Sequence, residues 1–140
     1  MPLELESFHG AVGSLGQALE HSEDVVLMNS LDESLRNVVQ SGVIKYFEFT
    51  YELSWKFIKR WLELNVSPNA ADGVTRRELY RLGFENRLID DVERWMDYHE
   101  ARNETTHTYR KATADEVYAA IPAFLDDARL LLAALEARND

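Results

Sequence analysis

Residues Val43 to Leu64 read VIKYFEFTYELSWKFIKRWLEL, and this stretch decides the fold. Its apolar residues recur at steps of three and four, the spacing of one face of a helix. One apolar stripe consists of Ile44, Phe47, Tyr51, Trp55, Ile58 and Leu62, and a second of Tyr46, Phe49, Leu53, Phe57, Trp61 and Leu64. The third stripe is charged throughout: Lys45, Glu48, Glu52, Lys56, Lys59 and Glu63. Two apolar stripes and one charged stripe predict a helix buried over most of its circumference, the central helix of a bundle with one face available for a subunit interface.

The segments on either side of this stretch also have helical periodicity. Helices are expected over residues 3–21, 30–64, 75–83, 88–102 and 113–137, with a loop over Asn65–Gly73 where Pro, Asn, Asp and Gly gather. No segment alternates apolar and polar residues as a half-buried strand does. The sequence therefore predicts an all-α protein.

Three short patterns mark where helices should begin. Ser30–Glu33, Thr75–Glu78 and Thr113–Glu116 each place a hydroxyl residue three positions before a glutamate, the pattern of a capping box. Gly83 is expected to end the short helix, since glycine is common just after a helix C-terminus. Pro122 lies inside the last helical pattern and is expected to kink it.

Composition narrows the class of protein. At 140 residues and 46% hydrophobic content, the chain is long and apolar enough for a single folded domain over residues 1–140. There is no cysteine, so a disulfide framework and a thiolate metal site are excluded. The first residues do not have the pattern of a signal peptide, and no apolar run approaches a membrane span, so we expect a soluble, cytoplasmic protein.

The net charge of −10 argues against a protein that binds along a nucleic-acid polymer without specificity. The segment from Ala101 to Lys111 is an exception, because it contains three cations and the single anion Glu104. A small basic segment on an acidic protein suits the binding of one phosphate group.

That basic segment contains the sequence RNETTHTY, Arg102 to Tyr109. Arg102 is a permanent planar cation suited to phosphate, and His107 can exchange a proton near neutral pH. A random shuffle of this composition would contain about 0.3 Arg-x4-His pairs, but only about 0.01 that also have a tyrosine two residues later. The full pattern is therefore more informative than the Arg-His pair.

Helix geometry adds a condition. Residues five apart in an unbroken helix lie about 140° apart around its axis, so Arg102 and His107 would point in different directions. They can serve one site only if the helix ends between them, and the β-branched Thr105 and Thr106 favour such an end. The alternative is a simple helix C-terminus at which an arginine and a histidine interact with the last carbonyl groups.

Other polar residues are better explained by ordinary helix surfaces. His99 precedes the motif and is either a supporting group or a surface residue, of which we favour the second. Glu48 and Glu52 have the four-residue spacing of metal ligands, but Lys45 and Lys56 flank them on one helix face, so helical ion pairs are the better interpretation. We expect neither a metal nor a cofactor.

The blocks FEFTYELSWK and RNETTHTY, with a Thr-capped short helix between them, resemble the HEPN superfamily, and more closely the HepT group of nucleotidyltransferase substrate-binding proteins. The resemblance covers residues 30–135. It implies a HEPN-like up-and-down antiparallel bundle of four long helices plus one short helix, assembled as a two-fold homodimer. It also implies a minimal nucleotidyltransferase as the partner.

The same resemblance implies roles for four residues. Many HEPN proteins are metal-independent endoribonucleases, and HepT proteins are toxins whose nucleotidyltransferase antitoxin adds AMP to the motif tyrosine. Carried to this sequence, Arg102 and His107 are catalytic, Asn103 supports them, and Tyr109 is the AMPylation site. Two other functions stay open: a non-catalytic nucleotide- or substrate-binding subunit of a two-component nucleotidyltransferase, and an assembly scaffold.

Overall fold

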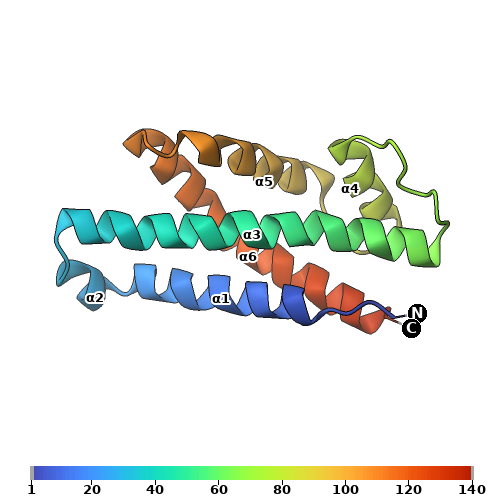
Figure 1. Cartoon of the computed structure of the whole chain (residues 1–140), viewed down its shortest axis with the longest axis horizontal. Coiled ribbons are helices and arrows are strands. Elements are labelled where there is room, and N and C mark those ends of the chain that lie inside the picture. Colours follow the sequence, from blue (N-terminus) through green and yellow to red (C-terminus); the bar gives the residue numbers. More distant parts are fainter. Residues whose placement is uncertain (1, 140) are drawn as a thin grey trace.

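The computed structural model describes residues 2–139, and within them it contains helices and no strands. The longest helix, α3 (Glu33–Asn65), runs the length of the molecule (Figure 1). The other long helices are α1 (Glu6–Glu23), α5 (Val92–Glu104) and α6 (Lys111–Ala137). Successive long helices run in opposite directions, which confirms the predicted all-α, up-and-down antiparallel bundle.

Two short α-helices join the long ones, where one was predicted. α4 (Arg76–Glu85) is the expected short helix, and α2 (Val25–Asn29) is an extra turn between α1 and α3. The side chain of Asp24 begins α2 by accepting a hydrogen bond from the backbone N–H of Leu27 at 3.0 Å. A five-residue helix is too short to show a periodic pattern, so its sequence could not reveal it.

The two apolar stripes of α3 have different surroundings. The first is buried except at Trp55, which is half-buried. The second is buried only at Phe57 and Trp61, whereas Tyr46 and Phe49 are 45% and 57% exposed. The N-terminal half of α3 therefore presents aromatic side chains on a face that no helix of its own chain covers.

Two of the three predicted helix starts are wrong. The N-cap of α3 is Asp32, whose side chain accepts from the N–H of Leu35 at 2.8 Å, while the Ser30 hydroxyl donates to the carbonyl of Leu27. α6 begins at Lys111 without a side-chain cap, so Thr113 lies inside its first turn. The prediction at Thr75 is confirmed, since its hydroxyl accepts from the N–H of Glu78 at 3.1 Å.

Gly83 does not end α4, which continues to Glu85 and is followed by Arg87 in the left-handed region at φ 61°. Gly83 is instead a packing position, because a Cβ added there would lie 3.4 Å from the side chain of Ile58. Pro122 lies within α6, which is continuous from Lys111 to Ala137.

A buried carboxylate fixes α5 against α6. Asp127 is 8% exposed and accepts two hydrogen bonds at 2.9 Å from the guanidinium of Arg94 and one at 2.5 Å from the hydroxyl of Tyr98. Burial, followed by the hydrogen bond to the carboxylate, raises the pKa of Tyr98 well above its ordinary value. This triad holds α5 in place one to two turns before the Arg102 motif.

Replacement of Asp127 by alanine should lower the free energy of unfolding by about 2–3 kcal/mol, because it leaves the buried Tyr98 hydroxyl without its acceptor and removes two charge-assisted hydrogen bonds from Arg94. Urea denaturation measures this change. The matched control is Asp126→Ala, at an exposed neighbouring position, which should stay within about 0.5 kcal/mol of the wild type. Equal effects of the two substitutions would contradict the role of the triad.

Candidate functional site

The helix ends within the motif, as the spacing of Arg102 and His107 requires. α5 ends at Glu104, and a 3₁₀ turn, η1 (Thr105–His107), follows it. Threonine hydroxyls stabilise this end by donating to backbone carbonyls: Thr105 to Arg102 at 2.7 Å and Thr106 to Asn103 at 3.3 Å. These bonds satisfy carbonyls that a continuing helix would use.

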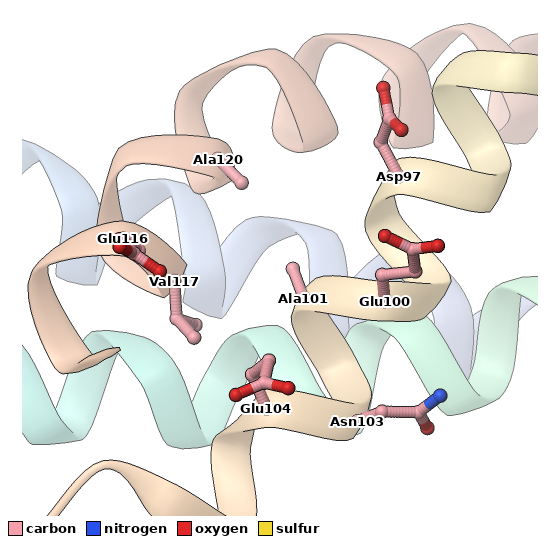
Figure 2. Close-up of a pocket in the computed structure, with 8 residues that line it drawn as sticks. All are labelled: Asp97, Glu100, Ala101, Asn103, Glu104, Glu116, Val117 and Ala120. Carbon is pink, nitrogen blue, oxygen red and sulfur yellow. The ribbon is translucent and has the colours of Figure 1, made fainter. Parts of the chain in front are cut away.

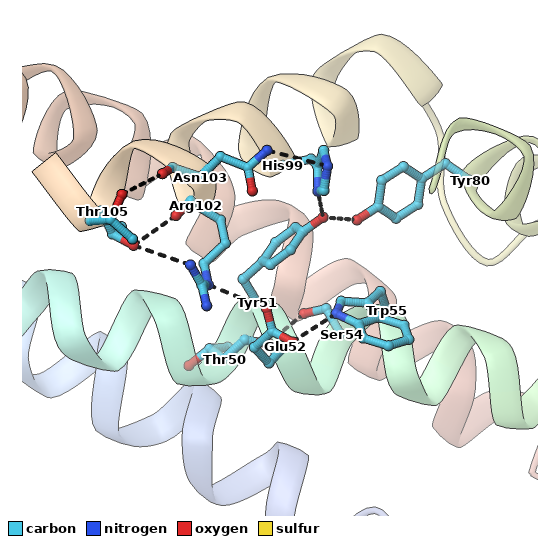
Figure 3. A network of polar contacts seen from close by, with 11 residues as sticks. Thr50, Tyr51, Glu52, Ser54, Trp55, Tyr80, His99, Arg102, Asn103 and Thr105 are labelled. Carbon is cyan, nitrogen blue, oxygen red and sulfur yellow. Dashed lines mark hydrogen bonds and ion pairs between the residues drawn. The ribbon is translucent and has the colours of Figure 1, made fainter. Parts of the chain in front are cut away.

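Arg102 is held by the central helix. Its Nε lies 3.2 Å from Glu52 Oε1, and its Nη1 donates to the Thr105 hydroxyl at 3.3 Å (Figure 3). The Nε–H does not point along the Arg102–Glu52 contact, so this contact is an ion pair without a well-formed hydrogen bond. Trp55 fixes the other carboxylate oxygen of Glu52, donating from Nε1 at 3.1 Å. The prediction of a helical ion pair for Glu52 is therefore wrong.

His107 is the last residue of η1 and Tyr109 follows two residues later, both on the surface. Both side chains are exposed, Tyr109 to 75%, and their rings meet edge to face with centroids 6.1 Å apart. The guanidinium of Arg110 lies 5.3 Å from the centre of the Tyr109 ring. Among residues 2–139, no hydrogen bond joins Arg102 to His107. One chain thus places Arg102 beside Glu52, and His107 beside Tyr109.

His99 is not the surface residue that we favoured from the sequence. It is half-buried, and its Nδ1 lies 3.0 Å from the hydroxyl of Tyr51, which in turn bonds the hydroxyl of Tyr80. The amide nitrogen of Asn103 lies 3.5 Å from His99 Nε2 (Figure 3). The one signal in the sequence was the four-residue spacing of His99 and Asn103, which places them on one helix face.

Burial perturbs the titration of this network. It raises the pKa of Tyr51 to about 12, with the bond to Tyr80 acting in the opposite direction. Burial also raises the pKa of Tyr80, and the adjacent Tyr51 adds to that effect. The pKa of His99 is lowered, first by burial and then by the nearby positive charge of Arg76. The hydroxyls and the imidazole are therefore all neutral at pH 7.

The two sides of the motif helix differ in charge. A hollow of about 400 Å³ between α5 and α6 is lined by four carboxylate side chains, those of Asp97, Glu100, Glu104 and Glu116 (Figure 2). Among residues 2–139, no three side chains of the metal-binding types come together as a metal site. On the other side, Arg102 borders a groove of about 340 Å³ whose charged lining is mixed: Lys45 and Lys56 of α3 stand with Glu48 and Glu52 of the same helix. An anionic ligand is repelled from the first space, and the second space is less unfavourable to it.

Fold and motif together define a HEPN-type helical bundle. The chain belongs to the family described as nucleotidyltransferase substrate binding protein like, whose model matches residues 3–137.

Similar proteins agree with this assignment. The chain is 35% identical, over 98% of its length and 94% of the relative's, to a *Haemophilus influenzae* protein named probable ribonuclease HepT. A solved *H. influenzae* structure, described as the fold of a substrate binding domain of a nucleotidyltransferase, is 30% identical with a TM-score of 0.91, covering 95% of this chain and 99% of that one. A *Thermus thermophilus* structure, 24% identical over 91% of this chain and 97% of its own, shares the fold with a TM-score of 0.63.

The buried pair of Tyr51 and Tyr80 should make the folded protein less stable at high pH. The pKa of Tyr51 is about 12 in the folded chain against an ordinary 10.0, so between these values the unfolded state loses a proton that the folded state keeps. The free energy of unfolding is therefore expected to decrease as the pH rises from 10.0 to about 12. In Tyr51→Phe this decrease should be shallower, as measured by urea denaturation at successive pH values. Tyr109→Phe, at an exposed tyrosine, is the control. Parallel curves for all three proteins would contradict the raised pKa of Tyr51.

Proposed function

We propose that the protein is a metal-independent endoribonuclease, the toxin of a HEPN/minimal-nucleotidyltransferase toxin–antitoxin pair. Arg102 and His107 are the catalytic residues, Asn103 supports them, and the partner inactivates the protein by AMPylation of Tyr109. The observation that carries the proposal is the end of α5 at Glu104, which leaves Arg102 anchored on the bundle and His107 and Tyr109 exposed beside it. The name of the *H. influenzae* relative, probable ribonuclease HepT, supports the same reaction class.

The reaction uses the nucleophile that RNA already contains. His107 accepts the proton of a 2′-hydroxyl, whose oxygen attacks the adjacent phosphorus. The bond to the 5′-oxygen breaks, the leaving oxygen takes up a proton, and a 2′,3′-cyclic phosphate remains. Arg102 stabilises the charge on the non-bridging oxygens by charge-assisted hydrogen bonds. A bound phosphate competes with Glu52 for Arg102, in a groove where Lys45 and Lys56 attract it and Glu48 opposes them.

A homodimer supplies the second catalytic histidine that one chain lacks. Proton transfer from the 2′-hydroxyl and to the leaving oxygen requires a base and an acid, and each chain contributes a single His107. A two-fold axis places the two copies of the motif in one cleft, where the histidines divide these tasks. The exposed aromatic residues Tyr46 and Phe49 of α3 favour such a dimer, because large apolar side chains on an uncovered helix face are typical of subunit interfaces.

The exposure of Tyr109 favours its modification. The phenol oxygen attacks the α-phosphate of ATP bound by the nucleotidyltransferase, pyrophosphate leaves, and the phenol proton is released. The AMP group then places a negative charge and a nucleoside two residues from His107. The AMP group blocks the catalytic site by its size and charge, and this requires no change of fold.

The purified protein should cleave single-stranded RNA in the presence of EDTA and leave 2′,3′-cyclic phosphate ends. His107→Ala should reduce the rate by about 100-fold or more, because the proton acceptor is lost. Gel analysis of end-labelled RNA measures the rate, and mass spectrometry identifies the ends. His21→Ala, at an exposed position in α1, is the matched control. Cleavage that persists in His107→Ala, or that EDTA abolishes, would contradict the proposal.

Co-expression with the partner nucleotidyltransferase should increase the intact mass of the protein by one or more AMP units. Tyr109→Phe should remove the increase, because phenylalanine has no nucleophilic oxygen. Tyr46→Phe, which removes another exposed phenol hydroxyl, should keep it. A mass increase that survives in Tyr109→Phe would place the modification elsewhere.

A non-catalytic, substrate-binding subunit is the second candidate function. The net charge of −10 favours it, since an acidic protein does not attract RNA. In this case the protein binds nucleotides near Arg102 and co-purifies with the nucleotidyltransferase, but the RNA assay shows no turnover.

A further inference from the structure

Two adjacent residues of α3 contact the motif helix α5. Glu52 pairs with Arg102, as described above, and Tyr51 contacts His99 one turn earlier on α5 (Figure 3). Tyr51 is 1% exposed and Tyr80 is fully buried, so neither hydroxyl can exchange its partner for bulk water. A hydroxyl enclosed in this way keeps its hydrogen bond, because an unsatisfied polar group in the core is costly.

We infer that His99 is a positioning residue of the candidate site, with Tyr51 and Tyr80 fixing its imidazole through Nδ1 so that Nε2 faces the amide of Asn103. This inference rests on the proposed function, which assigns Asn103 to the support of Arg102 and His107. It deepens that function by extending the site from the surface motif into the core of the bundle.

The path of contacts is continuous and crosses three helices. Tyr80 of α4 bonds Tyr51 of α3, Tyr51 bonds His99 Nδ1 at 3.0 Å, and His99 Nε2 lies 3.5 Å from the Asn103 amide on the next turn of α5. Asn103 is exposed and precedes the helix end by one residue, where little else restrains its side chain. Because Nδ1 of His99 is hydrogen-bonded to Tyr51 in the core, the imidazole has a fixed position beside the Asn103 amide.

The charges around His99 come from each helix that packs on it. Arg76 of α4 and Arg102 of α5 disfavour the imidazolium, whereas Glu52 of α3 and Glu100 of α5 favour it, and burial adds to the first effect. A neutral imidazole carries its hydrogen on only one nitrogen. The amide nitrogen of Asn103 can only donate, so its contact with Nε2 requires the lone pair there, and Nδ1 then donates its hydrogen to the Tyr51 hydroxyl. Tyr51 therefore supports the tautomer in which Nε2 accepts from the Asn103 amide.

The test compares wild-type protein with Tyr51→Phe, His99→Gln and the control Tyr118→Phe. The hydroxyl of Tyr118 bonds Ser22 of α1 at 2.6 Å, so Tyr118→Phe also removes a tyrosine hydrogen bond, but not one made to His99. Thermal unfolding first establishes that each variant is folded at the assay temperature. Tyr51→Phe keeps the ring and its volume, so that the core stays filled.

The first readout does not depend on catalysis. Imidazole ¹⁵N shifts above the pKa of His99 should show one dominant tautomer in the wild type and in Tyr118→Phe, and a mixture in Tyr51→Phe. The side-chain amide resonances of Asn103 should move in both Tyr51→Phe and His99→Gln. Unchanged tautomer and Asn103 amide signals in Tyr51→Phe would overturn the inference.

The second readout is the kinetics of RNA cleavage. Tyr51→Phe and His99→Gln should lower kcat by about tenfold to 100-fold with a smaller change in KM, because a displaced supporting group costs rate more than binding. Tyr118→Phe should match the wild type. Wild-type kcat in both site variants would overturn the inference. A wild-type protein that does not cleave RNA overturns the proposed function instead, and the NMR signals then still decide whether Tyr51 positions His99 and Asn103.

Discussion

The structure depends on the burial of α3, whose apolar residues cover more of its circumference than any one neighbouring helix can shield. α1, α4, α5 and α6 all contact it, and each contact removes part of that apolar surface from water. The packing around α3 also determines where the polar side chains of this helix can lie. Tyr51 and Glu52 are adjacent in the sequence, yet one faces the core and the other its border, and they contact different residues of α5. The helix that holds the bundle together is thus also the support of the candidate site.

Periodicity predicted the helices well because it reports burial directly. The two apolar stripes of α3 predicted a helix enclosed on several sides. The structure confirms this for the first stripe and for Phe57 and Trp61 of the second, whereas Tyr46, Phe49 and Leu64 are exposed. Helix starts were predicted less well, since a capping box is a pattern of two residues and several residues compete for the same position. At the start of α3, Ser30 and Asp32 both have suitable side chains, and the carboxylate of Asp32 caps the helix while Ser30 belongs to the preceding turn. At α6 the helix begins before its capping pattern.

The candidate site was predictable where its geometry is local. A shared site for Arg102 and His107 requires the helix to end near Thr105; the helix does end there, and the hydroxyls of Thr105 and Thr106 stabilise the end. The partners of these residues were not predictable, because they come from distant parts of the chain. His99 and Tyr51 are 48 residues apart, and Tyr51 and Tyr80 are 29 apart. Glu52 has lysines nearby in the sequence, and only the packing of α5 on α3 brings Arg102 closer.

The two ends of the described chain are joined to each other. The Asn139 side chain accepts from the N–H of Leu3 at 2.6 Å and donates to its carbonyl at 2.9 Å. Figure 1 places this junction at one end of the bundle, while the turn between α5 and α6 lies at the other. A domain or affinity tag fused at either terminus therefore lies at the same end of the bundle. It does not obstruct the opposite end, where the turn with Tyr109 lies. The loop between α3 and α4 lies at the same end of the bundle in Figure 1 and is a natural place to open the chain if the present ends are linked.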